Sequence, residues 1–435
     1  MRLYKKGDKK LLNAWAFYDW ANSVYPLVIS TAIFPIYFKS ITKGEPVNFL
    51  WLNSIENDAF IGYVSSFTFI ILAVISPILS GIADHTGYKK LFMQIFCYIG
   101  AISCILLYTF DLDNFDLGMI YYFFAVVGFW GSLVFYNSYL PDIANVDEQD
   151  ITSAKGYSLG YLGSIILLIF CLLLTQFPDY FNIDGKTQAV KISFVLVGIW
   201  WLVFSQYSFY YLPGKSYYNI KKTNLYSSKT LLSGFNQLID VLNQLKTNKK
   251  LRIFLLSFFI FTIPTQTIIL LASYFGADLN EISWSNEETM QSGLIIAIIV
   301  IQILAAAGAY LGAKLSNRFG NINTLIGINI LWAVICLFGY FVTTPFEFYC
   351  AAGFIGLGMG GIQSLSRSTY SKLIDEKYST SYFSFYDVSQ KLSIVIGTSL
   401  YATMDIFTGS IRLAILLFAL LFIPSIYFLF KMSKS

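Results

Sequence analysis

The sequence predicts an all-α membrane protein whose twelve membrane-spanning helices form two halves of six. Three observations lead to this fold class. Of the 435 residues, 56% are hydrophobic and 12% are charged, whereas about 25% are charged in a typical soluble protein. The chain also contains twelve predominantly apolar stretches of about 20 residues, the length that crosses a bilayer core. Finally, Lys and Arg residues gather in alternate loops, as they do in multi-pass membrane proteins.

Most predicted spans are joined by short loops, and one long polar connection divides them into two groups. The spans cover residues 12–38, 59–83, 91–110, 117–140, 156–176, 191–212, 252–275, 290–313, 322–342, 346–371, 382–405 and 410–430. We therefore expect an N-terminal half at 1–212, a lysine-rich cytoplasmic linker at 213–250 and a C-terminal half at 251–435. Apolar residues at helical spacing from Leu231 to Leu245 predict a surface amphipathic helix in the linker.

The distribution of basic residues predicts the orientation. If both termini and every even-to-odd loop lie on one side, that side holds 24 of the 29 Lys and Arg residues. The positive-inside rule places this side in the cytoplasm. We therefore expect a multi-pass protein of a bacterial cytoplasmic membrane with both termini cytoplasmic. Because the basic residues are dispersed among loops, we expect no nucleic-acid partner.

The residues that usually carry enzyme chemistry are sparse. The chain has a single histidine, His85, and its five cysteines all lie in apolar segments. It contains no HExxH sequence and no phosphate-binding loop. We therefore expect no catalytic residue, no metal site and no cofactor.

Two carboxylates within apolar segments are candidates for proton coupling. Asp19 lies about 12 Å into the first span if that helix begins near Leu11, where a charge costs on the order of 3 kcal/mol. It must therefore face a protein interior or a wet cavity, as a coupling group or as a structural hydrogen-bond anchor. Asp387, near the start of the eleventh span, is the second candidate. Its alternative role is an ion pair with Lys391, four residues on, or with Arg367.

Neutral polar residues within the spans are candidates for lining a substrate cavity. They are Asn22, Tyr25, Asn137, Gln266, Gln302 and Gln363. Amides can bind an amino or carboxylate group without a net charge, and the alternative is hydrogen bonding between helices, worth about 0.6–2 kcal/mol. Glycines also cluster in the tenth span, between Gly353 and Gly361, where they indicate either a bendable helix or close helix packing.

Two loops at corresponding places in the halves resemble each other. The first, Ser80–Lys90, follows the second span, and the second, Gly312–Gly320, follows the eighth. Both resemble the Gly-x-x-x-Asp-Arg-x-Gly-basic-basic signature of the major facilitator superfamily, whose two six-helix halves enclose a site near the membrane midplane. The resemblance implies a cytoplasmic gate formed by the matching residues Asp84, Lys89, Lys90 and Arg318.

Two further basic residues are gate candidates. Arg367 lies near the cytoplasmic end of the tenth span, and Lys391 lies near that of the eleventh. Arg367 has two alternative roles, since its guanidinium could bind a substrate carboxylate in a bidentate manner or snorkel to lipid headgroups.

Five further motifs are more specific. They are Tyr18–Ser23, Tyr136–Asp142, Gly156–Tyr161, Gly360–Ser368 and Phe385–Ser389. Together they resemble the vacuole-effluxer-like branch of the superfamily along essentially the whole chain. This resemblance implies a multi-pass transporter, and fungal members of the branch are associated with amino-acid efflux from the vacuole. The seventh span departs from the branch pattern, because Ile263 stands where an acid is usual.

We therefore expect a secondary active transporter that moves a small polar solute by alternating access. The carboxylates within the spans favour proton coupling, with Asp19 acting alone or with Asp387, and the resemblance favours amino-acid export. Its partners would be the solute, protons and the lipid bilayer, and we expect a monomer. The alternative is a non-transporting membrane sensor or scaffold with the same fold. The sequence leaves open import against export and proton against sodium coupling.

Overall fold

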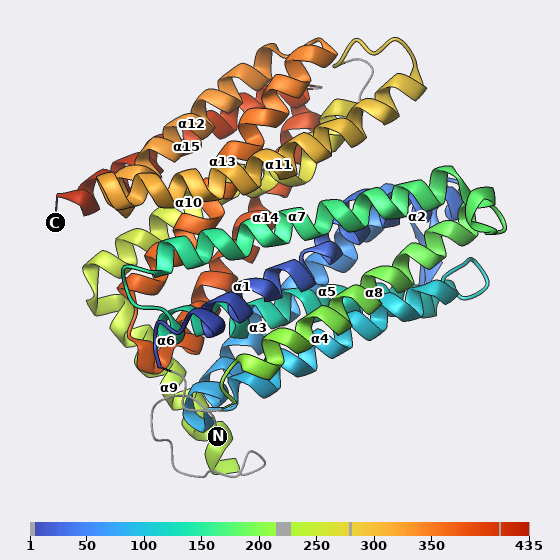
Figure 1. Cartoon of the computed structure of the whole chain (residues 1–435). Helices are drawn as coiled ribbons and strands as arrows, with labels where there is room; N and C mark the ends of the chain where they lie inside the picture. Colours follow the sequence, from blue (N-terminus) through green and yellow to red (C-terminus); the bar gives the residue numbers. More distant parts are fainter. Residues whose placement is uncertain (1–4, 215–227, 278–280, 409, 435) are drawn as a thin grey trace. The chain divides into compact units, whose positions relative to one another are not determined.

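The computed structural model describes residues 5–214, 228–277, 281–408 and 410–434, and helices dominate it (Figure 1). Within these residues, eleven helical segments are long and apolar enough to cross a membrane. The segments are Lys9–Thr42, Phe60–Thr86 in α3 (Asn57–Thr86), Lys89–Thr109 in α4 (Lys89–Leu106) and η2 (Leu107–Thr109), Phe115–Ile143 in α5 (Phe115–Asn137) and α6 (Tyr139–Ile143), α7 (Gln149–Gln176), α8 (Gly185–Tyr211), α10 (Lys249–Ala277), α11 (Glu287–Phe319), α12 (Asn321–Phe341), α13 (Pro345–Leu373) and α15 (Ile411–Ser433).

The remaining predicted span, 382–405, forms α14 (Ser379–Thr408). This helix has 30 residues, a length of about 45 Å, but it contains Asp387, Lys391 and several Ser and Thr residues. The predominantly helical membrane fold is thus confirmed, and α14 contains both partners of an ion pair.

The first span is not one continuous α-helix. It consists of α1 (Lys9–Asn22), a π-helical segment η1 (Tyr25–Ile33) and α2 (Phe34–Thr42). Pro26 explains the break, because proline has no N–H and its ring clashes with the carbonyl four residues earlier. Within the π-helical segment, the Thr31 hydroxyl donates to the Pro26 carbonyl at 2.8 Å. A π-helical segment inside a longer helix is frequently found at a functional site.

Two smaller elements lie between the long helices. The connection after α2 forms an antiparallel hairpin of β1 (Val47–Phe49) and β2 (Leu52–Ile55), which the sequence did not predict. The linker forms α9 (Ser228–Thr247), which confirms the predicted amphipathic helix. Two short 3-10 helices, η3 (Pro178–Phe181) and η4 (Glu376–Tyr378), precede α8 and α14.

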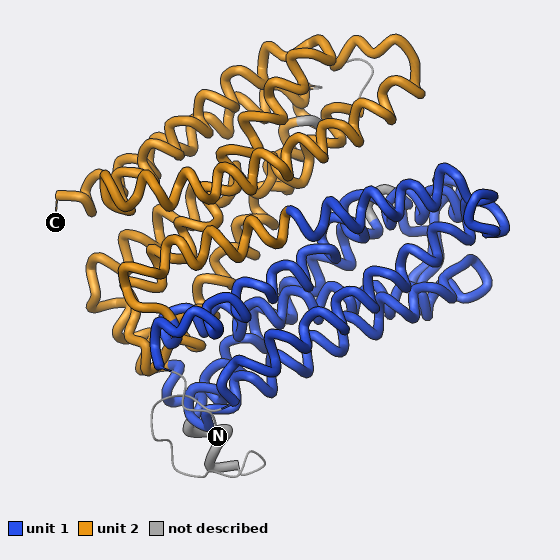
Figure 2. Tube along the Cα trace, in the orientation of Figure 1, with its two compact units in different colours: residues 1–143, 162–238 blue, residues 144–161, 239–435 orange. Residues whose placement is uncertain are grey.

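The chain divides into two compact units (Figure 2). Unit 1 comprises Met1–Ile143 and Leu162–Leu238, and unit 2 comprises Ala144–Tyr161 and Ile239–Ser435. The beginning of α7 therefore belongs to unit 2 and its remainder to unit 1. The halves predicted from chain order, with boundaries at 212 and 251, stay a prediction.

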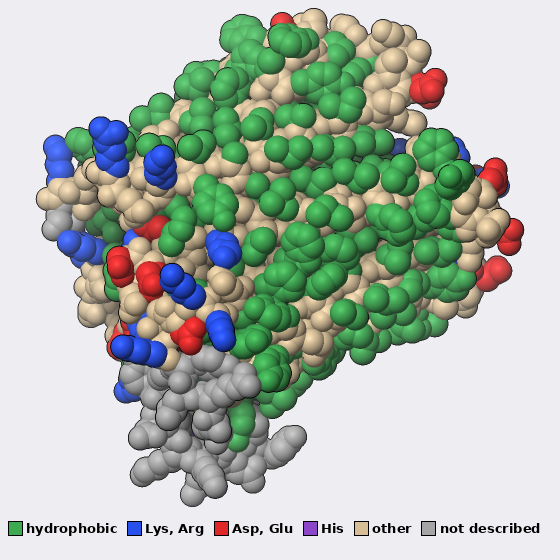
Figure 3. Space-filling view, in the orientation of Figure 1, with side chains coloured by type: hydrophobic (Ala, Val, Ile, Leu, Met, Phe, Trp, Pro, Cys, Tyr) green, Lys and Arg blue, Asp and Glu red, His purple; other side chains and the backbone are tan. Residues whose placement is uncertain are grey.

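Aromatic side chains form much of the core of unit 1, and the flanks of the helices are apolar. Phe34 stacks on Tyr122 with ring centroids 4.1 Å apart, and Phe110 stacks on the same Phe34 ring at 5.6 Å. In both units, hydrophobic side chains cover the visible helix flanks, while charged side chains gather near helix ends (Figure 3). This distribution suits helices whose flanks face lipid.

The glycines of α13 allow it to pack closely against α11. A Cβ atom added to Gly356 would clash with the carbonyl oxygen of Ile301, and one added to Gly360 would clash with that of Ala305. The reverse holds for Gly308 on α11, whose added Cβ would meet the Leu357 carbonyl. These contacts support the packing interpretation of the glycine cluster, since each glycine lets the two backbones touch.

We expect Gly360→Ala to lower the stability of the protein by about 1–3 kcal/mol, because it overpacks this contact. The matched control is Gly327→Ala in α12, where a Cβ meets no heavy atom within 4 Å among the described residues. That substitution should be neutral or stabilise by roughly 0.5–1 kcal/mol. Thermal unfolding of the purified variants in detergent measures both effects, and equal shifts would contradict the packing role.

Candidate functional site

Asp19 is buried in unit 1 and bound by a tyrosine. Its side chain lies in α1 with 4% of its surface exposed, and it accepts a hydrogen bond of 2.7 Å from the Tyr136 hydroxyl near the end of α5. The Tyr136 ring stacks on Trp15 at 4.6 Å. The Trp15 indole N–H in turn donates to the Tyr136 carbonyl at 2.9 Å. Two contacts from α1 thus fix the tyrosine that binds the carboxylate.

Buried donors without a partner lie in the same span as Asp19. Among the described residues, the Asn22 amide nitrogen and the hydroxyls of Tyr18 and Tyr25 have no hydrogen-bond partner. Asn22 and Tyr25 flank the transition from α1 to η1, and each is only 1% exposed. An unpaired buried donor costs about 1–3 kcal/mol. These groups are therefore candidates for binding water or a solute.

The other predicted cavity residues differ in burial and in their hydrogen-bond partners. Asn137 is half-buried at the end of α5, next to Tyr136. In unit 2, Gln266 on α10 is buried, and the Gln302 carbonyl oxygen on α11 has no partner among the described residues. Gln363 on α13 accepts a hydrogen bond of 2.7 Å from the Tyr161 hydroxyl, so for this residue the interhelical alternative is observed.

Asp387 and Lys391 form a buried ion pair on α14. Their exposed fractions are 5% and 1%. This is the predicted pairing of residues four positions apart, and Asp387 makes it with Lys391 rather than Arg367. Replacing a buried pair by well-packed apolar side chains is often neutral or stabilising, so stability alone does not explain why this helix carries one.

Arg367 ties α13 to the beginning of α7 within unit 2. Its Nε atom donates to the Ser153 hydroxyl and an Nη atom to the Ser153 carbonyl, both at 2.9 Å. Its guanidinium lies 4.1 Å from the centre of the Tyr157 ring. Because Arg367 is only 1% exposed, snorkelling to headgroups is excluded in this structure. The gate role of Arg367 stays a prediction.

The first signature-like loop, Ser80–Lys90, forms a buried contact that the sequence analysis did not predict. Lys89, at the start of α4, pairs with Asp142 of α6 and donates to the Ser138 carbonyl at 3.1 Å. Lys90 donates to the Leu212 carbonyl at 2.9 Å, and Asp84 is half-buried near the end of α3. The motif Tyr136–Asp142 contains the missed acid, so its place in that motif was the available signal.

The second signature-like loop, Gly312–Gly320, contacts a different acid, Asp150, which lies in unit 2. Asp150 is 2% exposed at the start of α7. It accepts hydrogen bonds from Lys372 at 2.7 Å, from the Asn321 amide at 2.8 Å and from the Ser316 hydroxyl at 2.9 Å. The predicted gate residue Arg318 is instead exposed and lies over the Phe319 ring. The sequence prediction missed Asp150 because other acids surround it in the chain.

We expect Asp150→Asn and Lys372→Met to show a coupling free energy of about 0.5–3 kcal/mol in a double-mutant cycle, because the two side chains share one network. Thermal unfolding in detergent provides the measurement. Asp147→Asn, at an exposed neighbouring acid, is the matched control and should show no coupling to Lys372→Met. Additive effects of the first pair would contradict the observed contact.

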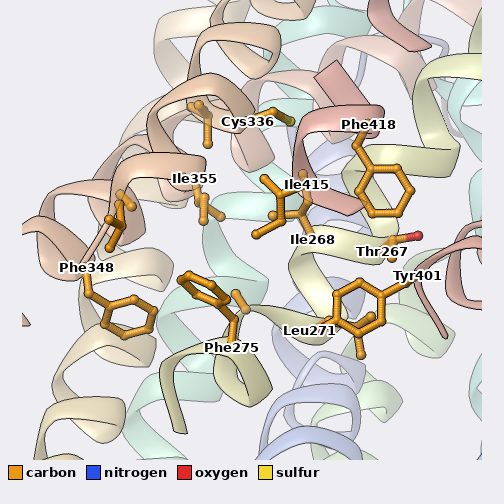
Figure 4. Close-up of a pocket in the computed structure, with 15 residues that line it drawn as sticks. Thr267, Ile268, Leu271, Phe275, Cys336, Phe348, Ile355, Tyr401, Ile415 and Phe418 are labelled. Atoms are coloured by element: carbon orange, nitrogen blue, oxygen red, sulfur yellow. The ribbon is translucent and has the colours of Figure 1, made fainter. Parts of the chain in front are cut away.

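A cavity of about 60 Å³ lies within unit 2 (Figure 4). Fifteen residues line it, most of them apolar, from α10, α12, α13, α14 and α15. Thr267 and Tyr401 are the lining residues that carry a hydroxyl. None of the predicted site residues lines this cavity, and its chemistry does not suit a polar solute.

Comparison with known proteins gives consistent similarities along nearly the whole chain. The family model described as "Vacuole effluxer Atg22 like" matches residues 7–435. An "Uncharacterized MFS-type transporter YxiO" of Bacillus subtilis (strain 168) is 30% identical over 419 residues, covering 96% of this chain and 93% of that protein. The "Autophagy-related protein 22" of Saccharomyces cerevisiae is 24% identical over 427 residues, covering 86% and 77%.

Solved structures show the same fold. The major facilitator transporter FucP in its outward conformation has a TM-score of 0.69 at 15% identity, covering 98% of this chain and 99% of that one. The human organic anion transporter MFSD10 has a TM-score of 0.72 at 11% identity, covering 98% and 100%. At these identities the likeness establishes the major facilitator fold and not a shared substrate.

Proposed function

Because the chain belongs to the Atg22-like vacuole effluxer family and is a multi-pass major facilitator transporter, not an enzyme, we propose that it exports a small polar solute in exchange for protons. An amino acid is the best candidate solute, by analogy with the efflux role of fungal members of the family. In unit 1 the proposed solute-binding residues are Asn22, Tyr25 and Asn137, in or near the span that contains Asp19. In unit 2 they are Gln266, Gln302 and Gln363.

The buried carboxylate of Asp19 is the observation that carries this proposal. An intramembrane ionisable group is expensive to keep, and such groups mark ion and proton pathways. Tyr136 donates a hydrogen bond to this carboxylate. Proton uptake by Asp19 would weaken this bond, which links protonation to one of the contacts between α1 and α5.

Asp387 is proposed as the second coupling residue, acting through its pair with Lys391. Ile263 on α10 is buried and stands where the family pattern has an acid, so a carboxylate from α10 is not available here. Protonation of Asp387 would leave Lys391 without its counter-charge, which gives the pair two states with different contacts.

The gate is proposed to consist of the buried contacts that join helix ends. In unit 1 these are Lys89 with Asp142 and Lys90 with the Leu212 carbonyl, with Asp84 in the same loop. In unit 2, Arg367 and Asp150 make such contacts between helices. Lys391 is included although its partner Asp387 lies on the same helix, and Arg318 would join these residues in another state. Alternating access requires groups whose contacts change between states, and these charged residues meet that requirement.

The remaining parts of the proposal concern location and assembly. We infer a monomer in a bacterial cytoplasmic membrane, with both termini and α9 on the cytoplasmic side. The excess of Lys and Arg on that side supports this orientation, and the similarity to a Bacillus protein supports the bacterial membrane.

A transport screen tests the proposed function. The purified protein is reconstituted into liposomes loaded with a pH-sensitive dye, and amino acids and small peptides are added one at a time. We expect at least one amino acid to cause proton movement that protein-free liposomes do not show. Solute movement without proton movement would overturn the coupling, and no response across the whole panel would overturn the amino-acid assignment.

A further inference from the structure

The linker helix α9 presents two different apolar surfaces, and only one of them packs against the protein. Gly234, Leu238 and Val241 recur at helical spacing and are buried. Phe235, Ile239 and Leu242, each one position further along, are 49%, 41% and 38% exposed. This second set, the exposed stripe, lies on one face of the helix because its members are spaced i, i+4, i+7.

The remaining face of α9 is polar. Asn236, Asp240 and Asn243 follow the exposed stripe by one position and are all exposed. The helix therefore divides into three sectors, which are the protein-packed face, the exposed apolar stripe and a polar stripe. A helix that contacts protein, the apolar edge of a membrane and water at the same time needs these three sectors.

The contact of α9 with α3 sets the depth of the exposed stripe. A Cβ added to Gly81 would clash with the Gly234 carbonyl, so the two backbones touch there. Along α3, a transmembrane helix, the exposed apolar residues Phe67, Ile70, Val74 and Ile78 form one stripe. This stripe ends three residues before Gly81, about 4.5 Å along the axis. Phe235, next to Gly234, is therefore level with the end of the exposed apolar stripe of α3.

The end of α9 is fixed in unit 2 and continues into a basic segment. Val241 is fully buried in a core cluster of that unit, and the Tyr382 hydroxyl donates to Gln244. Four exposed cations follow, with no acid among them: Lys246, Lys249, Lys250 and Arg252. Cations that follow an exposed apolar stripe match the headgroups of an anionic leaflet.

We propose that α9 is a membrane-docking helix whose exposed stripe inserts into the headgroup boundary of the cytoplasmic leaflet and whose following cations bind anionic phospholipid. The partner is the lipid surface itself. Burial of Phe235, Ile239 and Leu242 supplies the apolar part of the binding. The lysines supply the dependence on anionic lipid, because one lysine near such a surface changes the docked-to-undocked ratio about fivefold.

Depth-dependent quenching tests the docking. The full-length protein with Cys350→Ser is labelled with an environment-sensitive fluorophore at Ile239→Cys or, as the matched control, at Asp240→Cys. Each is placed in vesicles of phosphatidylcholine alone or of equal parts phosphatidylcholine and phosphatidylglycerol, with spin-labelled lipids as quenchers. We expect the label at position 239 to be quenched and the label at 240 to stay exposed to water.

Two further comparisons separate the parts of the proposal. Lys249→Gln with Lys250→Gln should reduce the quenched fraction at position 239 in the mixed vesicles and leave it unchanged in pure phosphatidylcholine. Equal quenching at 239 and 240, or none at either, would overturn the docking. Equal quenching at 239 in both lipid mixtures would overturn the anionic part, and a photo-crosslink from position 242 to a second copy would assign the stripe to self-association instead.

Discussion

Asp19→Asn is expected to abolish solute-driven proton movement while leaving solute exchange in place. Asparagine is close in shape to aspartate and can still accept the hydrogen bond from Tyr136, but it cannot take up a proton. The carrier would therefore still bind and exchange solute without exchanging protons. Liposomes with an internal pH dye measure proton movement, and counterflow of labelled solute in the same preparation measures exchange.

Two control variants make this result specific. Asp113→Asn removes an exposed acid outside the predicted spans and should leave both measurements unchanged. Tyr136→Phe removes the hydroxyl that binds Asp19 while keeping the ring that stacks on Trp15, and it should change the pH dependence of transport more than the amount of folded protein. Wild-type proton movement in Asp19→Asn would show that Asp19 is a structural hydrogen-bond acceptor.

Lys391→Met is expected to destabilise the protein by about 3–5 kcal/mol, because it leaves the buried carboxylate of Asp387 without its counter-charge. The double variant Asp387→Leu/Lys391→Met removes both charges and should recover most of this loss. We expect the recovered protein to show weakened solute-driven proton movement, since its second coupling carboxylate is gone. Thermal unfolding and the dye assay are measured on the same preparations.

The ion pair between Arg412 and Glu281 is more exposed than the pair between Asp387 and Lys391, and it serves as the control. Its side chains are 18% and 16% exposed, so Arg412→Met should destabilise the protein less than Lys391→Met does. If the double variant at 387 and 391 is stable and transports protons at the wild-type rate, the pair serves packing alone and Asp387 has no coupling role.

The sequence was sufficient to predict the membrane-spanning segments and the contacts within single helices. Apolar stretches of the right length predict the spans because the bilayer core sets their length. The amphipathic spacing from Leu231 to Leu245 predicted α9, and the four-residue separation of Asp387 and Lys391 predicted their pair. These features depend on local periodicity, which a single sequence contains in full.

Features that depend on tertiary contacts were not predictable in the same way. Asp142 and Asp150 bind Lys89 and Lys372, which are 53 and 222 positions away in the chain. The choice among several acids in the stretch from Asp142 to Asp150 depends on how α4, α6, α7 and α13 pack. Pro26 predicts a break in the first helix, but the nine-residue extent of the π-helical segment Tyr25–Ile33 could not be read from the sequence.

The most direct test of proton-coupled transport is solute accumulation driven by a pH gradient alone. Proteoliposomes free of sodium are given equal solute concentrations inside and outside and then a pH difference across the membrane. We predict that the wild type moves solute to an unequal distribution and that Asp19→Asn leaves it equal. Equal distributions for both proteins, or accumulation that requires sodium, would contradict the account.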